Sequence, residues 1–209
     1  DGTKTHKLVL NGLFGDVEQV TTTKKLIDNK TLSDFKIKCL VLKYSDEDRK
    51  FCKKHWSSEP NAGPMKYSDE IDWLITNQQR QRFITNLAES LDGNTLVLFN
   101  QVIKQGKPLH ESIQKKVADG RPVFYVSGEV KTIEREEVRK ITEISDNAII
   151  VASYGTFSTG INIKKLHNVV FASPSKSRVR NLQSIGRALR KGNGKTSAVL
   201  YDVVDDLKY

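Results

Sequence analysis

The chain has 209 residues and a formal net charge of +9, which comes from 34 lysines and arginines against 25 aspartates and glutamates. This length is enough for one large domain, or for one domain and part of another. No apolar run approaches the ~20 residues that a membrane-spanning helix needs, so we expect no membrane partner. The basic charge favours a polyanionic partner, although it says nothing about the fold.

The cysteines, the histidines and the amino end exclude further classes of protein. Cys39 and Cys52 lack the spacing of metal ligands and the four histidines are scattered, so we expect reduced thiols and no metal site. No signal peptide is visible, which favours a cytoplasmic location. The sequence begins at Asp1 rather than at a methionine, which suggests a fragment or a processed chain.

The first part of the chain predicts several short elements. We expect an amphipathic helix over residues 1–15, a short strand over 17–22 and a second brief helix over 23–29. Residues 35–44 alternate between polar and apolar and then run apolar, which predicts the first strand of a larger domain.

A loop and a long helix are predicted next. Residues 57–65 carry prolines and a glycine, which is typical of a mobile loop. The helix is expected over residues 71–91, with a break near Asn77. It contains Arg80 and Arg82, which we interpret as a solvated face rather than as nucleic-acid contacts.

After residue 94 the pattern becomes regular, because short apolar runs alternate with amphipathic stretches. Strands are predicted over residues 95–100, 122–126, 148–152, 169–172 and 197–202, and helices over 107–119, 132–144 and 177–190. Strands that alternate with helices at short spacing imply right-handed crossovers. The expected fold is therefore of the α/β class, with a parallel sheet covered by helices on both faces.

One of these strands opens into hydroxyl and glycine residues. The apolar run 147–152 is followed by Ser153-Tyr154-Gly155-Thr156 and then by Ser158-Thr159-Gly160-Ile161-Asn162. A buried strand that ends in this way offers N–H and O–H donors at the carboxyl edge of a sheet. Ligands bind at this edge in α/β folds, so we expect a loop with a binding role over residues 153–160.

The helix predicted over residues 177–190 has two distinct faces. Three apolar residues recur at i, i+3 and i+7 and are expected to face a core: Leu182, Ile185 and Leu189. Gln183, Arg187 and Arg190 recur on another face, which Gly186 leaves open to the close approach of a ligand. Two guanidinium groups on consecutive turns suit phosphate oxygens. The alternative is two solvated arginines on a surface helix.

Two apparent nucleotide motifs are rejected. Gly194-Lys195-Thr196 spells the end of a phosphate-binding P-loop, but the first glycine of that motif would stand where Leu189 is. The triplet also follows a helix and precedes a strand, which is the reverse of the P-loop order, so we interpret residues 192–195 as a basic turn. Asp205-Asp206 follows the last predicted strand and has no histidine after it, so it does not form a DExH motif.

Two stretches together resemble motifs of superfamily 2 helicases. Residues 153–162 (SYGTFSTGIN) are similar to motif V, and residues 183–190 (QSIGRALR) are similar to motif VI, of the form QxxGRxxR. The resemblance covers nearly the whole chain. It implies a RecA-like parallel sheet with helices on both faces. Residues 35–209 would form the second RecA-like domain, and residues 1–34 would be the tail of the first.

The resemblance also implies roles for individual residues. The catalytic arginine fingers would be Arg187 and Arg190. The residues that contact ATP would be Gly160, Asn162, Gln183 and Gly186. The residues that contact nucleic acid would be Asn100, Ser127, Gly128, Ser153 and Thr156. ATP and Mg²⁺ would be bound mainly by an upstream RecA-like domain of the same protein. Position 162 is Asn where many relatives have Asp, which keeps a hydrogen bond to a ribose hydroxyl but removes the charge.

The expected function is that of the C-terminal motor half of an ATP-dependent DNA helicase or translocase. Such a motor would remodel branched, recombining or repair-intermediate DNA through sequence-tolerant backbone contacts. One alternative is an RNA helicase, because contacts to phosphates do not separate DNA from RNA. The other is a non-catalytic nucleic-acid-binding domain that keeps a motor fold. The isolated chain has neither a P-loop nor a DExH motif, so we expect it not to hydrolyse ATP.

Overall fold

The computed structural model describes residues 2–16, 18, 20–53, 66–117, 120–160, 163–192 and 194–207. They divide into two compact units, Asp1–Leu32 and Ser33–Tyr209. The loop predicted over residues 57–65 lies outside the described residues.

The first unit contains two helices, α1 (Gly2–Phe14) and α2 (Thr23–Asp28). Both were predicted. The strand predicted over residues 17–22 is wrong for the residues of this stretch that the structure describes, which have no strand conformation. Thr22 instead caps α2, because its hydroxyl accepts a hydrogen bond from the Lys25 N–H at 3.3 Å. The assignment of residues 1–34 to a first RecA-like domain stays a prediction.

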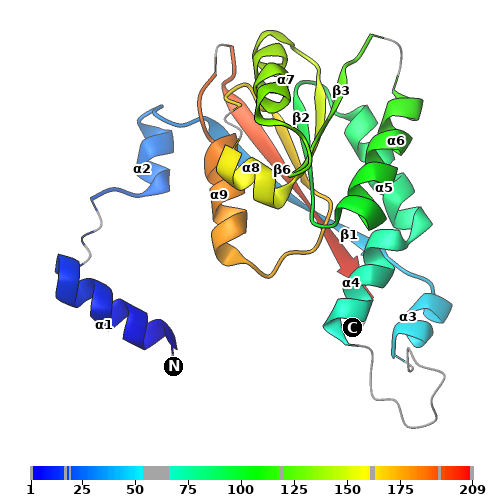
Figure 1. Ribbon diagram of the computed structural model, residues 1–209, viewed down its shortest axis with the longest axis horizontal. Coiled ribbons are helices and arrows are strands. Elements are labelled where there is room, and N and C mark those ends of the chain that lie inside the picture. The colour runs from blue at the N-terminus through cyan, green and yellow to red at the C-terminus, as the bar shows by residue number, and fades with distance from the viewer. Residues whose placement is uncertain are drawn as a thin grey trace. The chain divides into compact units, whose positions relative to one another are not determined.

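The second unit is built on a six-stranded parallel sheet (Figure 1). Its strands are β1 (Asp34–Lys43), β2 (Thr95–Phe99), β3 (Val123–Val126), β4 (Ile149–Ser153), β5 (Asn168–Phe171) and β6 (Ser197–Asp206). Their order across the sheet is β1-β6-β5-β2-β4-β3, and every pairing is parallel. The central strands β2 and β5 are buried throughout, as expected where helices cover both faces. The predicted α/β class is confirmed.

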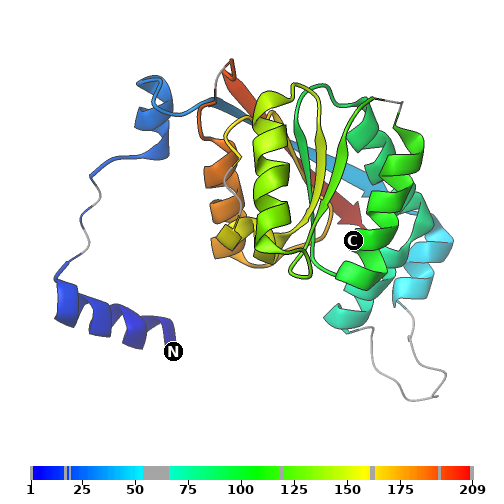
Figure 2. The ribbon, with the colours of Figure 1, turned by 45° about the horizontal axis from the view of Figure 1, so that its top comes forward.

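Helices lie on both faces of this sheet (Figures 1 and 2). One face is covered by α5 (Gln78–Ser90) and α6 (Lys107–Lys116), and the other by α7 (Thr132–Ile144), α8 (Tyr154–Gly160) and α9 (Arg178–Ala188). Side chains alternate along β2, so Val97 and Phe99 pack against the first layer, whereas Leu96 and Leu98 pack against the second. The remaining elements are α3 (Asp46–Lys53), α4 (Tyr67–Thr76) and the π-helix η1 (Val102–Gly106).

The helix predicted over residues 71–91 is broken at Asn77, as expected. Asn77 has extended backbone angles (φ −63°, ψ 118°), so α4 ends before it and α5 begins after it. Its side-chain oxygen accepts a hydrogen bond from the Arg80 N–H at 2.9 Å, which caps the amino end of α5. The break therefore has a local cause, which is the helix-capping side chain of Asn77.

Arg80 was predicted on a solvated face, and this prediction is wrong. Its side chain is 1% exposed and forms a bidentate ion pair with Asp205, with Nε–Oδ1 at 2.8 Å and Nη2–Oδ2 at 3.1 Å. Nη1 donates to the Ala172 carbonyl at 2.6 Å, and the Tyr44 hydroxyl donates to Asp205 Oδ1, also at 2.6 Å. The pair forms because β6 runs to Asp206, four residues beyond its predicted end. Arg82, in contrast, is exposed as expected.

Asn94 is a buried hydrogen-bond centre at the amino end of the sheet. Its Nδ2 group lies 2.9 Å from the carbonyl oxygens of Thr142, Ser145 and Lys165. Its Oδ1 accepts from the Ala148 N–H at 2.8 Å. One side chain thus joins the start of β2 to the end of α7, the start of β4 and the segment before β5.

We expect Asn94→Ala to lower the free energy of unfolding by at least about 2 kcal/mol, because several buried backbone groups lose their partner at once. Urea denaturation followed by circular dichroism measures this loss. Asn86→Ala is the matched control, since Asn86 is exposed on α5 and its replacement should change stability by no more than about 0.5 kcal/mol. Equal denaturation midpoints for the two variants would contradict the role given to Asn94.

Candidate functional site

Three neighbouring strands of the sheet end at the same edge and place predicted site residues there. Because the strands are parallel, Phe99 pairs with Ser153, and Val126 pairs with Ala152. The carboxyl ends of β2, β3 and β4 therefore lie side by side. The residues that follow or complete them are the predicted backbone-contacting set: Asn100, Ser127, Gly128, Ser153 and Thr156. The structure brings these five residues to one edge, and their roles stay predictions.

The hydroxyl-rich stretch after β4 forms a helix, α8, and the prediction of a loop over residues 153–160 is wrong. Ser153 caps this helix, because its Oγ accepts a hydrogen bond from the Thr156 N–H at 3.3 Å. The two hydroxyl oxygens lie 2.8 Å apart. Ser153 is half-buried and Thr156 is buried, so a ligand would meet Ser153 first. Gly160 is the last residue of α8, and Asn162 lies outside the described residues.

Asn100 joins the sheet edge to the arginine-bearing helix. Its backbone N–H donates to Ser173 Oγ at 2.9 Å, and its Nδ2 donates to the Pro174 carbonyl at 3.3 Å. Its Oδ1 accepts from Arg180 Nη1 at 3.1 Å. Sequence reasoning missed Arg180 as a cation at this edge. The signal was present, since Arg180 precedes Gln183 by three residues and continues the same helical face.

The neighbouring turn after β3 has a buried and an exposed part. Ser127 is buried, and its Oγ accepts from the Glu129 N–H at 3.3 Å. Gly128 is exposed, and its carbonyl accepts from Arg135 Nη2 at 3.3 Å. A ligand can approach the backbone at Gly128 directly, whereas the buried Ser127 hydroxyl stabilises the turn through its hydrogen bond.

The buried face of α9 differs from the predicted apolar stripe. Leu189 is buried and Ile185 is half-buried, but Leu182 is 56% exposed, so the prediction is wrong for Leu182. Ser184 and Ala188 are buried instead, one helical turn apart. Small side chains on this face let α9 pack closely against its neighbours in the same layer.

The two catalytic candidates, in and just after the last turn of α9, have different surroundings. Arg187 is half-buried, and its guanidinium carbon lies 5.6 Å from the centre of the Phe157 ring of α8, a cation–π contact. Burial and the neighbouring Arg190 lower the pKa of Arg187. Arg190 is exposed, as are Gln183 and Gly186, and a Cβ added at Gly186 would meet nothing within 4 Å. The helix was predicted to run to Arg190, but it ends at Ala188, so α9 carries Arg187 and the exposed Arg190 lies two residues beyond its end.

The carboxyl end of α9 is held by Lys195, a residue that sequence reasoning left in a basic turn. The turn exists, because the Lys195 N–H donates to the Gly192 carbonyl at 3.1 Å. Its ammonium, however, is buried and donates to the carbonyl oxygens of Ala188, Arg190 at 2.9 Å and Lys164 at 3.4 Å. Burial lowers the pKa of Lys195 to about 8. These bonds satisfy the last carbonyls of the helix and fix the point at which Arg190 leaves it.

The part of the chain that the structure describes has neither a cluster of metal ligands nor a membrane-spanning helix. Within that part of the chain, no three His, Cys, Asp or Glu side chains gather as metal ligands would. The helices described there include none with the length and apolar character needed to cross a membrane.

The fold and this sheet edge define a class of protein. The helicase conserved C-terminal domain family matches residues 78–192, which include β2, α8 and all of α9, and the chain belongs to this family. Among known proteins, the ATP-dependent DNA helicase UvsW of Enterobacteria phage T4 is 38% identical over 197 residues. The match covers 93% of this chain and 36% of the phage protein, so the chain spans about a third of that relative.

Solved structures agree with this assignment. The crystal structure of T4 UvsW superimposes with a TM-score of 0.68 at 36% identity, over 84% of this chain and 33% of that one. A putative HsdR subunit of a type I restriction enzyme from Vibrio vulnificus gives 0.61 at 15% identity, over 95% and 37%. The DNA-bound restriction-modification enzyme LlaBIII gives 0.59 at 18% identity, over 93% and 13%. The last two show the fold alone, and the predicted RecA-like fold is confirmed, whereas the predicted domain bounds stay a prediction.

Proposed function

We propose that this chain is the C-terminal motor half of an ATP-dependent DNA helicase or translocase that remodels branched, recombining or repair-intermediate DNA. The observation that carries the proposal is the placement of the arginine helix. Arg187 packs on α8, which follows β4, and Arg180 of the same helix bonds Asn100 after β2. The helix α9, whose Arg187 suits phosphate, thereby contacts the carboxyl edge of the sheet, whose polar groups suit a nucleic-acid backbone.

The proposed ATP site lies between two domains. ATP and Mg²⁺ would be held mainly by an upstream RecA-like domain, to which residues 1–34 would belong, because this sequence has no P-loop and no DExH motif. This chain would add the guanidinium groups of Arg187 and Arg190. Gly160, Asn162, Gln183 and Gly186 would line the nucleotide. A half-buried and an exposed cation beside bare glycine backbone fit a polyphosphate, so the residues present suit the ligand.

The proposed chemistry follows from charge. In phosphoryl transfer, negative charge spreads over the oxygens of the γ-phosphate, and Mg²⁺ and cationic side chains stabilise it. Arg187 is pre-positioned by its contact with Phe157, so little reorganisation is needed when the domains close. Arg190 would reach the same oxygens from the segment that follows α9. Closure on ATP and opening after hydrolysis would move the sheet edge relative to the partner domain and step it along the strand.

The nucleic-acid contacts are proposed to be sequence-tolerant. Asn100, Ser127, Gly128, Ser153 and Thr156 would present neutral donors or backbone groups at one edge, and such groups position phosphates without reading bases. We further propose a location in the host cytoplasm, because the T4 relative is a phage protein.

The test uses the complete polypeptide that contains this chain, with matched forked and four-way substrates made of DNA, RNA or DNA–RNA hybrid. We expect ATP-dependent remodelling of branched DNA and little activity on RNA. Equal or faster unwinding of RNA would favour the RNA helicase instead. Binding without any ATP-dependent product would favour a non-catalytic domain. Parallel reactions with a non-hydrolysable ATP analogue separate remodelling from passive strand capture.

A further inference from the structure

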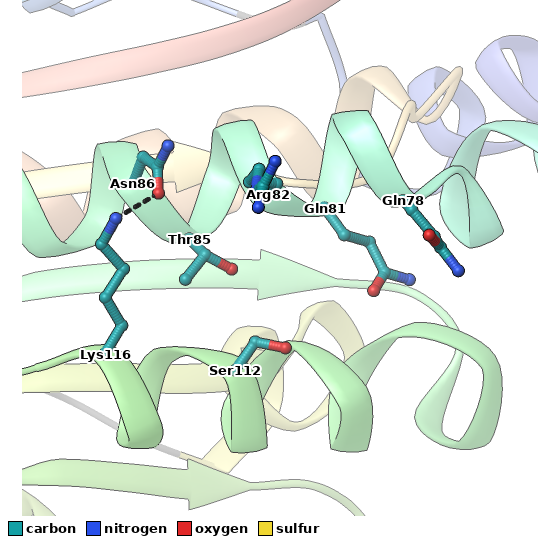
Figure 3. Close-up of a pocket in the computed structure, with 7 residues that line it drawn as sticks. All are labelled: Gln78, Gln81, Arg82, Thr85, Asn86, Ser112 and Lys116. Carbon is teal, nitrogen blue, oxygen red and sulfur yellow. Dashed lines mark hydrogen bonds between the residues drawn. The ribbon is translucent and has the colours of Figure 1, made fainter.

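A polar groove lies between α5 and α6, on the face of the sheet opposite α9 (Figure 3). Its volume is about 440 Å³, and it is open to solvent along the two helices. The groove is separate from the sheet edge that carries the proposed motor contacts. Nothing in the proposed function uses it.

The side chains that line this groove are suited to an anion. Arg82 and Lys116 supply two cations, one from each helix, and Gln78 supplies an amide. The α5 positions 78, 82 and 85 recur about once per turn and so share one face, as do Ser112 and Lys116 on α6. No carboxylate lines the groove among the residues that the structure describes.

The two cations keep their charge available for a ligand. Lys116 Nζ donates to Asn86 Oδ1 at 2.5 Å, which is a neutral partner, and Figure 3 shows this bond across the groove. Within the described ranges, neither Arg82 nor Lys116 forms an ion pair with a carboxylate. A neutral partner orients the ammonium without cancelling its field, whereas a carboxylate would offset it.

The floor of the groove contains an unsatisfied hydroxyl. Thr85 is 5% exposed, and its Oγ1 has no hydrogen-bond partner among the described residues. Its side chain points from α5 toward α6, and Ser112 points back from α6 toward α5 (Figure 3). A buried hydroxyl without a partner costs free energy, and native proteins rarely leave one unpaired. A ligand oxygen, or a water held beneath a ligand, would satisfy this hydroxyl.

We propose that the α5–α6 groove binds a phosphodiester group of a nucleic-acid strand, as a second anchoring point away from the sheet edge. This proposal rests on the proposed function, because only a nucleic-acid motor would bring such a strand to the groove. An open groove with donors on both walls accepts a polymer backbone that enters and leaves along it. Cations, amides and hydroxyls contact phosphate oxygens without reading bases, so this anchor is independent of sequence. The groove would hold the strand during the step in which the residues at the carboxyl edge of the sheet release it.

The test measures equilibrium binding of a labelled single-stranded DNA to the complete protein by fluorescence anisotropy, over a series of salt concentrations. The variant is Arg82→Gln with Lys116→Gln. We expect about a tenfold loss of affinity and a salt slope that is smaller by ~0.7, since that is the contribution of one neutralised phosphate on a single strand. ATP hydrolysis without DNA should be unchanged.

The matched control is Lys115→Gln with Lys140→Gln, which removes the same charge from exposed positions on α6 and α7 outside the groove. Thr85→Val is a second variant, because it keeps the shape of the floor but removes the hydroxyl. We expect it to weaken DNA binding while leaving stability unchanged or higher. A purely structural role for the groove would instead alter stability and leave binding intact.

The outcomes separate this proposal from the proposed function. If the wild-type protein binds no nucleic acid, both are overturned. If it binds but the groove variant matches the control, only the groove proposal falls. Millimolar inorganic phosphate is added in a further arm. Another outcome is that phosphate raises the melting temperature of the wild type but not that of the groove variant, while both bind DNA equally well. That result would assign the groove to a free phosphate and overturn the nucleic-acid proposal.

Discussion

Replacing Arg187 or Arg190 by alanine in the complete protein is expected to lower kcat for ATP hydrolysis by about 10³–10⁵-fold. Each guanidinium is proposed to stabilise negative charge that develops only in the transition state. Its loss should therefore leave the affinity for ATP in the ground state nearly unchanged. Nucleotide binding should therefore remain measurable. Steady-state hydrolysis at saturating DNA, together with equilibrium binding of a fluorescent ATP analogue, measures the two quantities separately.

The position of Arg187 makes a sharper version of this experiment possible. Arg187→Lys keeps the positive charge but loses the planar fork and weakens the stacking on Phe157, so most activity should still be lost. Lys191→Ala is the control, because Lys191 is exposed and directly follows Arg190. Turnover within about threefold of wild type in both arginine variants would remove the basis for the motor proposal, and would favour a non-catalytic domain that keeps the fold.

Asp205→Ala should be the most destabilising single change in the sheet domain, at about 3–5 kcal/mol. The substitution leaves the guanidinium of Arg80 buried and without its bidentate partner, and it also removes the acceptor of the Tyr44 hydroxyl. Chemical denaturation of this chain measures the loss. The double variant Arg80→Met with Asp205→Leu should recover most of it, because an apolar pair avoids the cost of desolvating both charges.

The next residue on the same strand is the matched control. Asp206 pairs with Arg49 at 2.7 Å, but these side chains are 29% and 27% exposed, so solvent screens the pair. Asp206→Ala should cost no more than about 1 kcal/mol. Equal losses for Asp205→Ala and Asp206→Ala would mean that burial does not set the strength of these two pairs, contrary to the packing seen around Arg80.

Much of the fold could be predicted because its signals are local. The alternation of apolar runs with amphipathic stretches gave the strands β2 to β5 and the helices around them within a few residues. The break at Asn77 was visible because an asparagine that caps a helix acts on the residues directly after it. The helix that holds Arg187 was visible for the same reason, but its predicted end at Arg190 was wrong, because α9 ends at Ala188.

The site was predicted less completely. Hydroxyl and glycine residues after β4 indicated a binding edge, but Ser153 turns the chain into α8 by capping it, and this choice depends on the packing of Tyr154 and Phe157 into the core. Arg180 was overlooked because its partner, Asn100, lies 80 residues away. The roles predicted for Gly160 and Asn162 remain predictions.

The sequence by itself determined the α/β class, the order of most elements and the helix that carries the arginines, because these depend on periodicity and on neighbours within a few residues. Only the tertiary structure decided that Arg80 is buried against Asp205, that Lys195 holds the end of α9 and that Leu182 faces solvent. Burial of a given face depends on which distant segment covers it. A pattern of residues along one helix reports that a face is apolar or charged, but not what lies opposite.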